Sequence, residues 1–424
     1  MLKIVEAGNR KAVRALLAAE RVRDAATEAR VAAIVHDVRR HGDRALRRYA
    51  RELDRLEGPM EISRDEMREA ARTVPRDVRA AIKVAARNIR AVAKAQVPKG
   101  WRVTVTRGVV VEQRVRPLDR VGCYVPGGRY PLPSSVLMTA IPAVVAGVPD
   151  VIAVCPKPDA TVMAAALEAG VSRLFRLGGA HAIAALAYGT ASVPRVDKIV
   201  GPGNRYVAAA KALVSADCGI DFFAGPSEIV IIATKGPAEW LAADLIAQAE
   251  HDPDARAVLI TPNAKLAAQV AQLVEARTPQ EGPAKGALKA HGGIIVTGST
   301  DEAIALANDF APEHLVVEDD AMADRVRCAG SLFVGPWSAQ VAGDYAIGSN
   351  HVLPTAGTAR VRGGLSAADY VRQITVQRLT ESGLRAIGDA VVSLAHAEGL
   401  HAHAESVAVR LLSSDRSRKQ AGRS

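Results

Sequence analysis

The chain has 424 residues, 49% of them hydrophobic, so it is long enough to bury a large core and to form two or three domains. Its formal net charge of +10 would suit a nucleic-acid-binding protein, but only 4% of the residues are aromatic, which leaves few rings for base stacking. Arginine is interleaved with acidic residues in the N-terminal region, as on solvated helix faces, so we expect small anionic ligands and no nucleic acid.

The apolar segments and the cysteines indicate a cytoplasmic protein without a disulfide framework. The N-terminal MLKIVEAGNRK lacks the apolar run of a signal peptide. The most apolar stretch, AIPAVVAGVPDVIAVC, is interrupted by Pro142, Pro149 and Asp150, so we expect no membrane span. The four cysteines are widely spaced and form no C-x-x-C pair, which excludes the usual thiolate zinc patterns. The ligands of any metal must then be mainly histidines and oxygen donors.

The first quarter of the chain is expected to be helical, because apolar residues recur there near helical spacing, as at Val31, Ile34 and Val38. A segment rich in β-branched residues, VTVTRGVVVEQRV, begins at Val103 and indicates β-structure. After Leu365 no further strand pattern occurs, so the remainder of the chain is again expected to be helical.

Between these regions, apolar runs of strand length alternate with helical stretches. The runs are DVIAVCP, RLFRLGG, DKIVGPG, EIVIIAT, RAVLITP, GGIIVTG, EHLVVE and GSLFVG. Such alternation predicts α/β layers with mostly parallel strands. The number of runs favours two sheets over one.

Three of the expected strands run directly into glycine turns: YVPGG from Tyr124, RLGGAH up to His181, and IVGPGN up to Asn204. Glycine lets the backbone approach a ligand, and a following helix N-terminus offers free N–H groups to a phosphate. One such turn alone is usually only a tight turn, but three on one sheet point to a nucleotide pocket at the carboxyl ends of the strands. Neither G-x-G-x-x-G nor G-x-x-x-x-G-K-[ST] occurs, so the usual dinucleotide fingerprint and the P-loop are absent.

A glutamine and a histidine three residues apart occur near the end of DLIAQAEHD. On a helix, Gln248 and His251 would share one face, one turn from the terminus, ahead of Pro253. They are either part of a metal site or a polar helix end with a histidine near the negative pole of the dipole. The segment alone favours the second interpretation, and the first requires more ligands from elsewhere.

Further candidates lie in three polar stretches of the C-terminal half. APEHLVVE supplies Glu313 and His314, which suit general acid/base catalysis but would equally fit an exposed pair in a turn. GDYAIGSNHVLPT supplies Asp344 and His351 in a glycine-rich, irregular segment. AHAEGLHAH, at an expected helix end, contains His396, Glu398, His401 and His403. Gln248, His251, Asp344 and one of the last histidines would together form a site of two imidazoles and two oxygen donors, which suits zinc, although manganese or cobalt would also fit.

Eight stretches, taken in order, resemble the histidinol dehydrogenase family over roughly residues 20–410. They are GCYVPGGRYPLPSSVLM, LGGAHAIAALAYGT, VDKIVGPGN, FFAGPSE, DLIAQAEHDPDA, APEHL, GDYAIGSNHVLPT and GLHAH. The resemblance implies an enzyme of histidine biosynthesis that oxidises L-histidinol to L-histidine in two NAD-linked steps and keeps L-histidinaldehyde bound between them.

The resemblance also implies a role for each matching residue. Its zinc ligands, which also bind the substrate, are Gln248, His251, Asp344 and His403. Its other substrate contacts are Ser227, His314, His351 and Glu398, and its acid/base pair is Glu313 and His314. Its NAD contacts are Tyr124 and Asn204, with His181 at a third position. Zinc would orient the substrate through its imidazole and amine, and the family forms a domain-swapped homodimer in which Glu398 and His403 complete the site of the partner subunit.

The expected fold is α/β, with two incomplete Rossmann-like domains that have parallel-rich sheets, and with small helical segments at both ends. We expect an N-terminal helical segment at residues 1–22 and a first α/β domain, with the zinc and acid/base residues, from residues 23–122 and 228–365. An inserted second α/β domain at residues 123–227 would bind NAD, and residues 366–424 would form a helical segment swapped in the dimer.

The sequence departs from the family pattern at three places. His181 replaces a glutamine, so the nucleotide contact expected there is in question. Phe222 and Phe223 replace a Met-Pro or Leu-Pro pair, and WSAQVAGDY lacks the Pro-Glu that often precedes Gly-Asp.

Aldehyde oxidation often uses a cysteine thiohemiacetal. No basic neighbour in sequence marks Cys123 or another cysteine as an activated nucleophile, so we assign the cysteines to packing.

Two other functions were weighed against this one. A paralogous NAD-dependent dehydrogenase on the same scaffold could oxidise another small polar alcohol, such as a sulfopropanediol, and Arg129 leaves that alternative open. Retention of Ser227, Glu228 and Glu398 favours the imidazole-containing substrate. A non-catalytic binding protein would be expected to have lost Glu313, His314 or a zinc ligand, and none is lost.

Overall fold

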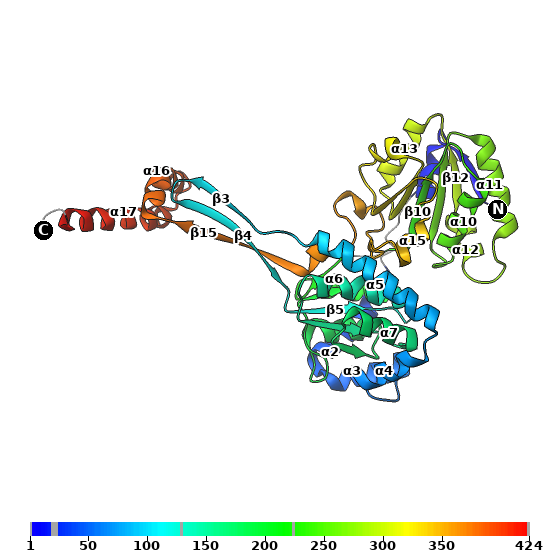
Figure 1. Cartoon of the computed structure of the whole chain (residues 1–424), viewed down its shortest axis with the longest axis horizontal. Coiled ribbons are helices and arrows are strands. Elements are labelled where there is room, and N and C mark those ends of the chain that lie inside the picture. Colours follow the sequence, from blue (N-terminus) through cyan, green and yellow to red (C-terminus); the bar gives the residue numbers. More distant parts are fainter. Residues whose placement is uncertain (1, 18–23, 128–129, 223–224, 422–424) are drawn as a thin grey trace. The chain divides into compact units, whose positions relative to one another are not determined.

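The computed structural model describes residues 2–17, 24–127, 130–222 and 225–421. The chain folds into two compact units (Figure 1). The first unit consists of Met1–Gln96 and Leu118–Tyr370, and the second of Val97–Pro117 and Val371–Ser424. No described helix combines the length and the hydropathy that a bilayer crossing requires.

The first unit contains two six-stranded sheets (Figure 1). One has the strand order β2-β7-β6-β5-β8-β9 and is parallel except where β2 pairs with β7. Its strands are β2 (Glu61–Ile62), β5 (Arg120–Tyr124), β6 (Asp150–Val154), β7 (Arg173–Phe175), β8 (Lys198–Val200) and β9 (Gly219–Ile220). We call it the β5 sheet.

Eight helices cover the β5 sheet, four on each face. One apolar cluster joins the sheet to α4 (Arg64–Thr73), α5 (Arg76–Gln96), α6 (Pro133–Val145) and α7 (Ala160–Ala169). A second cluster, on alternate strand residues, joins it to α2 (Ala25–His41), α3 (Asp43–Asp54), α8 (Gly179–Tyr188) and α9 (Arg205–Val214). Because successive strand residues point to opposite faces, these clusters define the two sides of one layered domain.

The other sheet, which we call the β10 sheet, is parallel throughout, with the order β1-β12-β11-β10-β13-β14. Its strands are β1 (Lys3–Glu6), β10 (Glu228–Ile232), β11 (Arg256–Thr261), β12 (Gly293–Val296), β13 (His314–Val317) and β14 (Ser331–Val334). Helices α10 (Ala238–Ala249), α11 (Ala264–Arg277) and α12 (Ala284–His291) pack on one face, and α1 (Arg10–Leu17), α13 (Thr300–Phe310) and α14 (Asp320–Ala323) on the other. Shorter elements follow: α15 (Gln340–Tyr345), η1 (Thr358–Arg360) and η2 (Ala367–Tyr370).

Continuous apolar runs form the central strands because helices cover them on both sides. All five residues of β10, EIVII, are buried, as expected for a strand in the middle of a parallel sheet.

Glycine has a particular role beside β5. Gly201 has φ +115°, and a Cβ there would collide with the carbonyl oxygen of Tyr124. Only glycine therefore lets the turn after β8 approach the end of β5 so closely.

The second unit is a three-stranded antiparallel sheet with two helices. The strand order is β15-β4-β3, formed by β15 (Val371–Leu379), β4 (Val109–Pro117) and β3 (Trp101–Thr106). Helix α16 (Glu381–Ala397) follows β15, and α17 (His401–Ala421) packs against α16. The expected β-structure from Val103 is therefore present, as β3 and β4.

Both ends of the chain contain a strand that the sequence did not predict. Residues 1–22 were expected to be helical, but β1 forms an edge of the β10 sheet before α1. Residues 366–424 were also expected to be helical, but β15 pairs with all nine residues of β4. Neither strand has a buried apolar stripe, because most of their residues are exposed or half-buried, so periodicity gave no strand signal.

The division of the chain between the sheets also differs from the expected boundaries. Residues 23–122 were assigned to the domain of residues 228–365, but helices α2 to α5 pack on the β5 sheet and strands β2 and β5 belong to it. The remaining part, residues 97–117, lies in the second unit. An amphipathic pattern shows that a helix has a buried face but does not show which sheet it covers.

Candidate active site

The predicted acid/base pair lies at the amino end of β13, beside the amino end of the neighbouring strand β10. Glu228 begins β10 and His314 begins β13, and these parallel strands pair with Ile229 opposite His314. Glu313 directly precedes β13, and both Glu313 and His314 are buried rather than exposed in a turn. A buried carboxyl group beside an imidazole requires specific partners, since unmet polar groups are costly inside a protein.

The two adjacent strands supply those partners. The backbone N–H of Glu228 donates to Glu313 Oε2 at 2.8 Å, and His314 Nδ1 lies 3.2 Å from the backbone oxygen of Glu228. Because a carbonyl oxygen only accepts, Nδ1 carries the proton and Nε2 presents a lone pair. Nε2 faces Oδ1 of Asp344 at 3.8 Å. His314 is thus held in the tautomer that a general base requires.

Burial sets the protonation of both members of the pair. It lowers the pKa of His314 to about 4, so the ring is neutral near pH 7. It raises the pKa of Glu313 well above the usual range, and nearby Glu228 and Asp344 act in the same direction. Burial also raises the pKa of Glu228 to about 7. Displaced pKa values of this kind cluster at functional sites, because burial and charge are arranged there for proton transfer.

Three of the predicted metal ligands belong to the same unit. Gln248 lies in the last turn of α10, and Asp344 lies in α15, which contacts α10. His251 Nε2 is 3.7 Å from Asp344 Oδ2. Burial raises the pKa of Asp344, but the interactions with His251, His314 and His351 outweigh it, so the pKa lies below its usual value. Asp344 is therefore ionised near neutral pH.

The expected position of His251 on a helix is wrong. Helix α10 ends at Ala249, with Glu250 as its C-cap, and His251 lies in the turn that follows. The backbone N–H of His251 donates to the backbone oxygen of Gln248 at 3.3 Å. The side chain of His251 is 42% exposed. The turn, rather than the face of a helix, holds this imidazole near Asp344.

The environment of Gln248 fits a metal. Its side chain is fully buried, and neither its Oε1 nor its Nε2 has a hydrogen-bond partner among the described residues. A buried amide without partners is costly unless a bound group meets it. An amide oxygen, an imidazole and an ionised carboxylate are the donors that zinc accepts. The described residues contain no cluster of three or more His, Cys, Asp or Glu side chains placed to hold a metal, and the set of Gln248, His251 and Asp344 includes only two residues of those types.

His351 connects the cluster to the β5 sheet. Its Nδ1 lies 3.0 Å from the backbone oxygen of Asp344, and its Nε2 lies 3.4 Å from Oγ of Ser135 in the first turn of α6, the helix after β5. Burial lowers the pKa of His351, so this ring is neutral as well. Ser227 is half-buried directly before β10, and its hydroxyl hydrogen bond to Glu313 moderates the raised pKa of that carboxyl group.

The predicted NAD contacts lie at the carboxyl ends of strands in the β5 sheet. Tyr124 is the last residue of β5, and its hydroxyl accepts from the N–H of Gly179 at 3.1 Å. His181 is fully buried in α8 with Nε2 2.8 Å from Asp54, while its Nδ1 has no partner among the described residues. Asn204 caps α9 by accepting from two backbone N–H groups, so its oxygen is already used. Arg129 and Phe223 lie outside the described residues.

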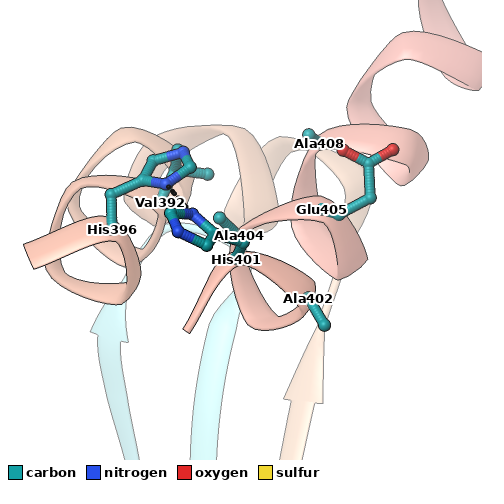
Figure 2. Close-up of a pocket in the computed structure, with 7 residues that line it drawn as sticks. All are labelled: Val392, His396, His401, Ala402, Ala404, Glu405 and Ala408. Atoms are coloured by element: carbon teal, nitrogen blue, oxygen red, sulfur yellow. Dashed lines mark hydrogen bonds between the residues drawn. The ribbon is translucent and has the colours of Figure 1, made fainter. Parts of the chain in front are cut away.

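Glu398 and His403 lie in the second unit, and both are exposed. Glu398 is the C-cap of α16, and His403 lies in the first turn of α17. A nearby pocket contains the rings of His396 and His401, whose Nδ1 atoms are 3.2 Å apart (Figure 2). Neither Glu398 nor His403 lines this pocket, so it does not coincide with the predicted ligand positions.

Sequence reasoning missed several residues that shape the site. Gln340 donates from Nε2 to Oδ2 of Asp344 at 2.8 Å, and Asp54 accepts from His181 and from the N–H of Gly178. Lys211 and Asp221 form a buried ion pair that also binds both backbone groups of Gly201. The contacts of Asp54 join segments more than 120 residues apart, and those among Lys211, Asp221 and Gly201 span 10 to 20 residues, so no helical or strand spacing indicates them. Gln340 and Asp344 are the exception, because Gln and Asp four apart on a helix are a recognisable pair.

Fold and site together define an α/β enzyme that places a buried carboxyl–imidazole pair beside the side chains predicted as metal ligands. A family profile described as histidinol dehydrogenase matches residues 17–411. The chain therefore belongs to the histidinol dehydrogenase family, whose members are oxidoreductases of histidine biosynthesis.

Individual relatives agree with this assignment. The chain is 43% identical to a histidinol dehydrogenase of Acinetobacter baylyi, covering 93% of this chain and 95% of that protein. It is 48% identical to a histidinol dehydrogenase of Halobacterium salinarum, covering 90% and 92%. The crystal structure of histidinol dehydrogenase from Elizabethkingia anophelis superimposes with a TM-score of 0.93 at 33% identity, covering 98% of this chain and 99% of that one.

Proposed function

We propose that this protein oxidises L-histidinol to L-histidine in two NAD-linked steps with zinc bound, and that L-histidinaldehyde stays in the site between the steps. The observation that carries the proposal is the buried Glu313–His314 pair beside Asp344, with Gln248 unpartnered in the helix that contacts α15. A buried acid/base pair next to a set of metal ligands suits an alcohol that must be both oriented and deprotonated.

Gln248, His251 and Asp344 would hold the zinc ion together with His403 of the partner subunit. The chemistry supplied by bound zinc would be orientation of the substrate through its imidazole and amine. Asp344 supplies a full negative charge, while His314 and His351 on either side of it are neutral and so do not repel a cation. Glu398 of the partner subunit and Ser227 would bind the polar groups of the substrate.

His314 would act as the general base. Its Nδ1–H is held by the oxygen of Glu228, so the free Nε2 takes the hydroxyl proton of the alcohol. The chemistry supplied by bound NAD would be acceptance of the hydride from the same carbon in each step. Because His314 is buried and neutral, it can accept this proton near pH 7.

Glu313 would serve the second step, in which the aldehyde must first be hydrated. Its raised pKa favours the protonated carboxyl group, but the fraction that is ionised is a stronger base towards water than an exposed glutamate. Oε2 is 3.6 Å from His314 Nδ1, so the carboxyl group lies directly beside the imidazole. The hydrate would then lose a hydride to a second NAD and a hydroxyl proton to His314, which leaves the carboxylic acid. Cys123 has no part in this route, because it is fully buried.

Tyr124, Asn204 and His181 would contact the nucleotide at the carboxyl ends of the β5 sheet, as ligands do in other open α/β sheets. The unpartnered Nδ1 of His181 provides one hydrogen-bonding atom where relatives of this pattern have an amide. The proposal includes a cytoplasmic homodimer in which each active site uses both subunits.

The test combines metal content with NADH yield. Purified protein is expected to contain one zinc per chain and to form two NADH per L-histidinol, and His251→Ala is expected to abolish both. His291→Ala, in the last turn of α12, is the matched control and should leave both unchanged. A zinc-free protein, or one that prefers small diols such as a sulfopropanediol, would overturn the proposal.

A second variant separates the two steps. Glu313→Gln should still oxidise the alcohol but should stall before the acid, so the yield falls towards one NADH per histidinol. Full two-step activity of this variant would refute the hydration role of Glu313 and leave the role of His314 standing.

A further inference from the structure

Gln340 is a buried amide with only half of its hydrogen bonding met. Its side chain is 0% exposed in the first turn of α15, and its Nε2 donates to Oδ2 of Asp344 at 2.8 Å. Its Oε1 has no partner among the described residues. An apolar side chain of similar length would fill the same space without burying an unmet oxygen, so packing alone does not explain an amide here.

The hydrogen bond fixes how the carboxylate of Asp344 is turned. An ionised carboxylate only accepts hydrogen bonds, so the amide must face it with its N–H. Oδ2 then lies between Gln340 Nε2 and His251 Nε2, and Oδ1 faces His314 Nε2 at 3.8 Å. Rotation of the carboxylate about its own axis would break these contacts together.

We propose that Gln340 is a positioning residue that orients the carboxylate of Asp344 for metal binding. This inference rests on the proposed function, because it takes Asp344 to be a zinc ligand. Gln340 does not touch the substrate and acts only through Asp344. Partners that hold a ligating carboxylate in this way strengthen metal binding, and their loss typically weakens it by about 10–100-fold.

A purely structural role of Gln340 and a positioning role predict different effects of removing its amide on thermal stability and on zinc affinity. A glutamine and an aspartate four residues apart on a helix can stabilise that helix by a hydrogen bond. If that were the whole role, removal of the amide would lower the thermal stability of the metal-free protein and leave zinc affinity alone. Positioning predicts the opposite pattern, because removing the unmet Oε1 from the core offsets the loss of one hydrogen bond.

The experiment compares full-length wild-type protein with Gln340→Met, which keeps the length of the side chain and removes both polar atoms. Zinc affinity is measured by competition with a chromophoric chelator, and thermal unfolding is measured on the metal-free protein. We expect zinc affinity to fall by about 10–100-fold. We expect the unfolding temperature to change by less than about 2 °C, as for a mutation worth well under 1 kcal/mol. Gln272→Leu, at an exposed position of α11, is the control and should change neither.

The outcomes separate this inference from the proposed function. If wild-type protein binds no zinc, the proposed function fails. If wild-type protein binds zinc and Gln340→Met binds it equally tightly, positioning by Gln340 is refuted. A large fall in metal-free stability with unchanged zinc affinity would assign Gln340 to the helix alone. Gln340→Leu repeats the comparison if the methionine variant does not fold. With histidinol, the weakened variant should regain kcat when excess zinc is added, since the acid/base pair is intact.

Discussion

Single side chains in this protein owe their chemistry to burial more than to their neighbours in sequence. Glu228, Glu313 and His314 all have pKa values displaced first by loss of water. The Glu-His dipeptide was visible in the sequence, but its burial was not, because it depends on a strand that pairs with a segment more than eighty residues away. The unusual pKa values therefore could not have been predicted from the motif.

Glu228 gives the protein a measurable dependence of stability on pH. Its pKa is about 7 in the folded chain against 4.5 for an ordinary glutamate, so the folded state holds its proton more tightly. The contribution of protonated Glu228 to the stability of the folded state is full below about pH 4.5 and is lost as pH rises through about 7. In metal-free protein, Glu228→Gln should therefore be more stable than wild type by about 1–3 kcal/mol at pH 8 and similar to it near pH 5. Urea unfolding at both pH values checks this, and parallel pH profiles would contradict it.

Cys123 is expected to be chemically silent. Burial raises its pKa to about 12, so almost no thiolate exists at neutral pH. Cys123→Ala should keep the two-step NADH yield while losing about 1–2 kcal/mol of stability from lost packing. In native protein, alkylation followed by mass spectrometry should modify Cys328 first, since it is the cysteine with partial exposure. A variant that stops at the aldehyde would instead show that the thiol takes part.

Strands that helices cover on both sides were predicted well, whereas strands with exposed faces were predicted at β3 and β4 but missed at β1 and β15. Each of the eight apolar runs forms a strand, which confirms the predicted α/β layering. Strands β1 and β15 were missed because their residues are largely exposed. Pairing of β15 with β4 also joins segments about 260 residues apart, and that distance leaves no local signal.

A close backbone contact should control the docking of α16 in the second unit. A Cβ on Gly383 would collide with the backbone oxygen of Gly108, which lies in the turn between β3 and β4 at φ +85°. Gly383→Ala is therefore expected to destabilise α16 by about 1–3 kcal/mol, seen as faster hydrogen exchange of its amides in the full-length protein. Gly286→Ala in α12 meets open space and should be neutral or slightly stabilising. Unchanged hydrogen exchange of the α16 amides in Gly383→Ala would show that the backbone at Gly108 shifts to make room for the added methyl group at no cost.

Across the whole chain, the sequence predicted which residues lie close together better than it predicted which domain holds them. His251, Glu313, His314, Asp344 and His351 are brought together in the first unit. Glu398 and His403 belong to the second unit. Domain boundaries were misplaced because a helix with one apolar face is compatible with either sheet. Gln340 lies beside a predicted ligand and was still missed, since its role depends on burial.

Sharing of the site between subunits can be tested by complementation. His251→Ala and His403→Ala should each be inactive alone. Dimers that contain one chain of each variant would keep one intact site, so co-expression should restore about a quarter of wild-type activity by random pairing. Co-expression of His251→Ala with Asp344→Ala places both lesions in the same unit and should restore none. Absence of recovery in the first pair would show that each chain builds its own site.

The position of His314 at the start of a central strand has a consequence for how such an enzyme can change. His314, the proposed proton-transfer group, is hydrogen-bonded to the backbone of β10, whereas Asp344 and His351 lie in a short helix and an irregular stretch. Replacement of the irregular segment could alter which alcohol is accepted while leaving the reactive imidazole in register. A scaffold arranged in this way is adaptable in substrate and conservative in chemistry, so directed evolution towards new alcohols should concentrate on residues 345–350 and 352–356 and keep Asp344 and His351 unchanged.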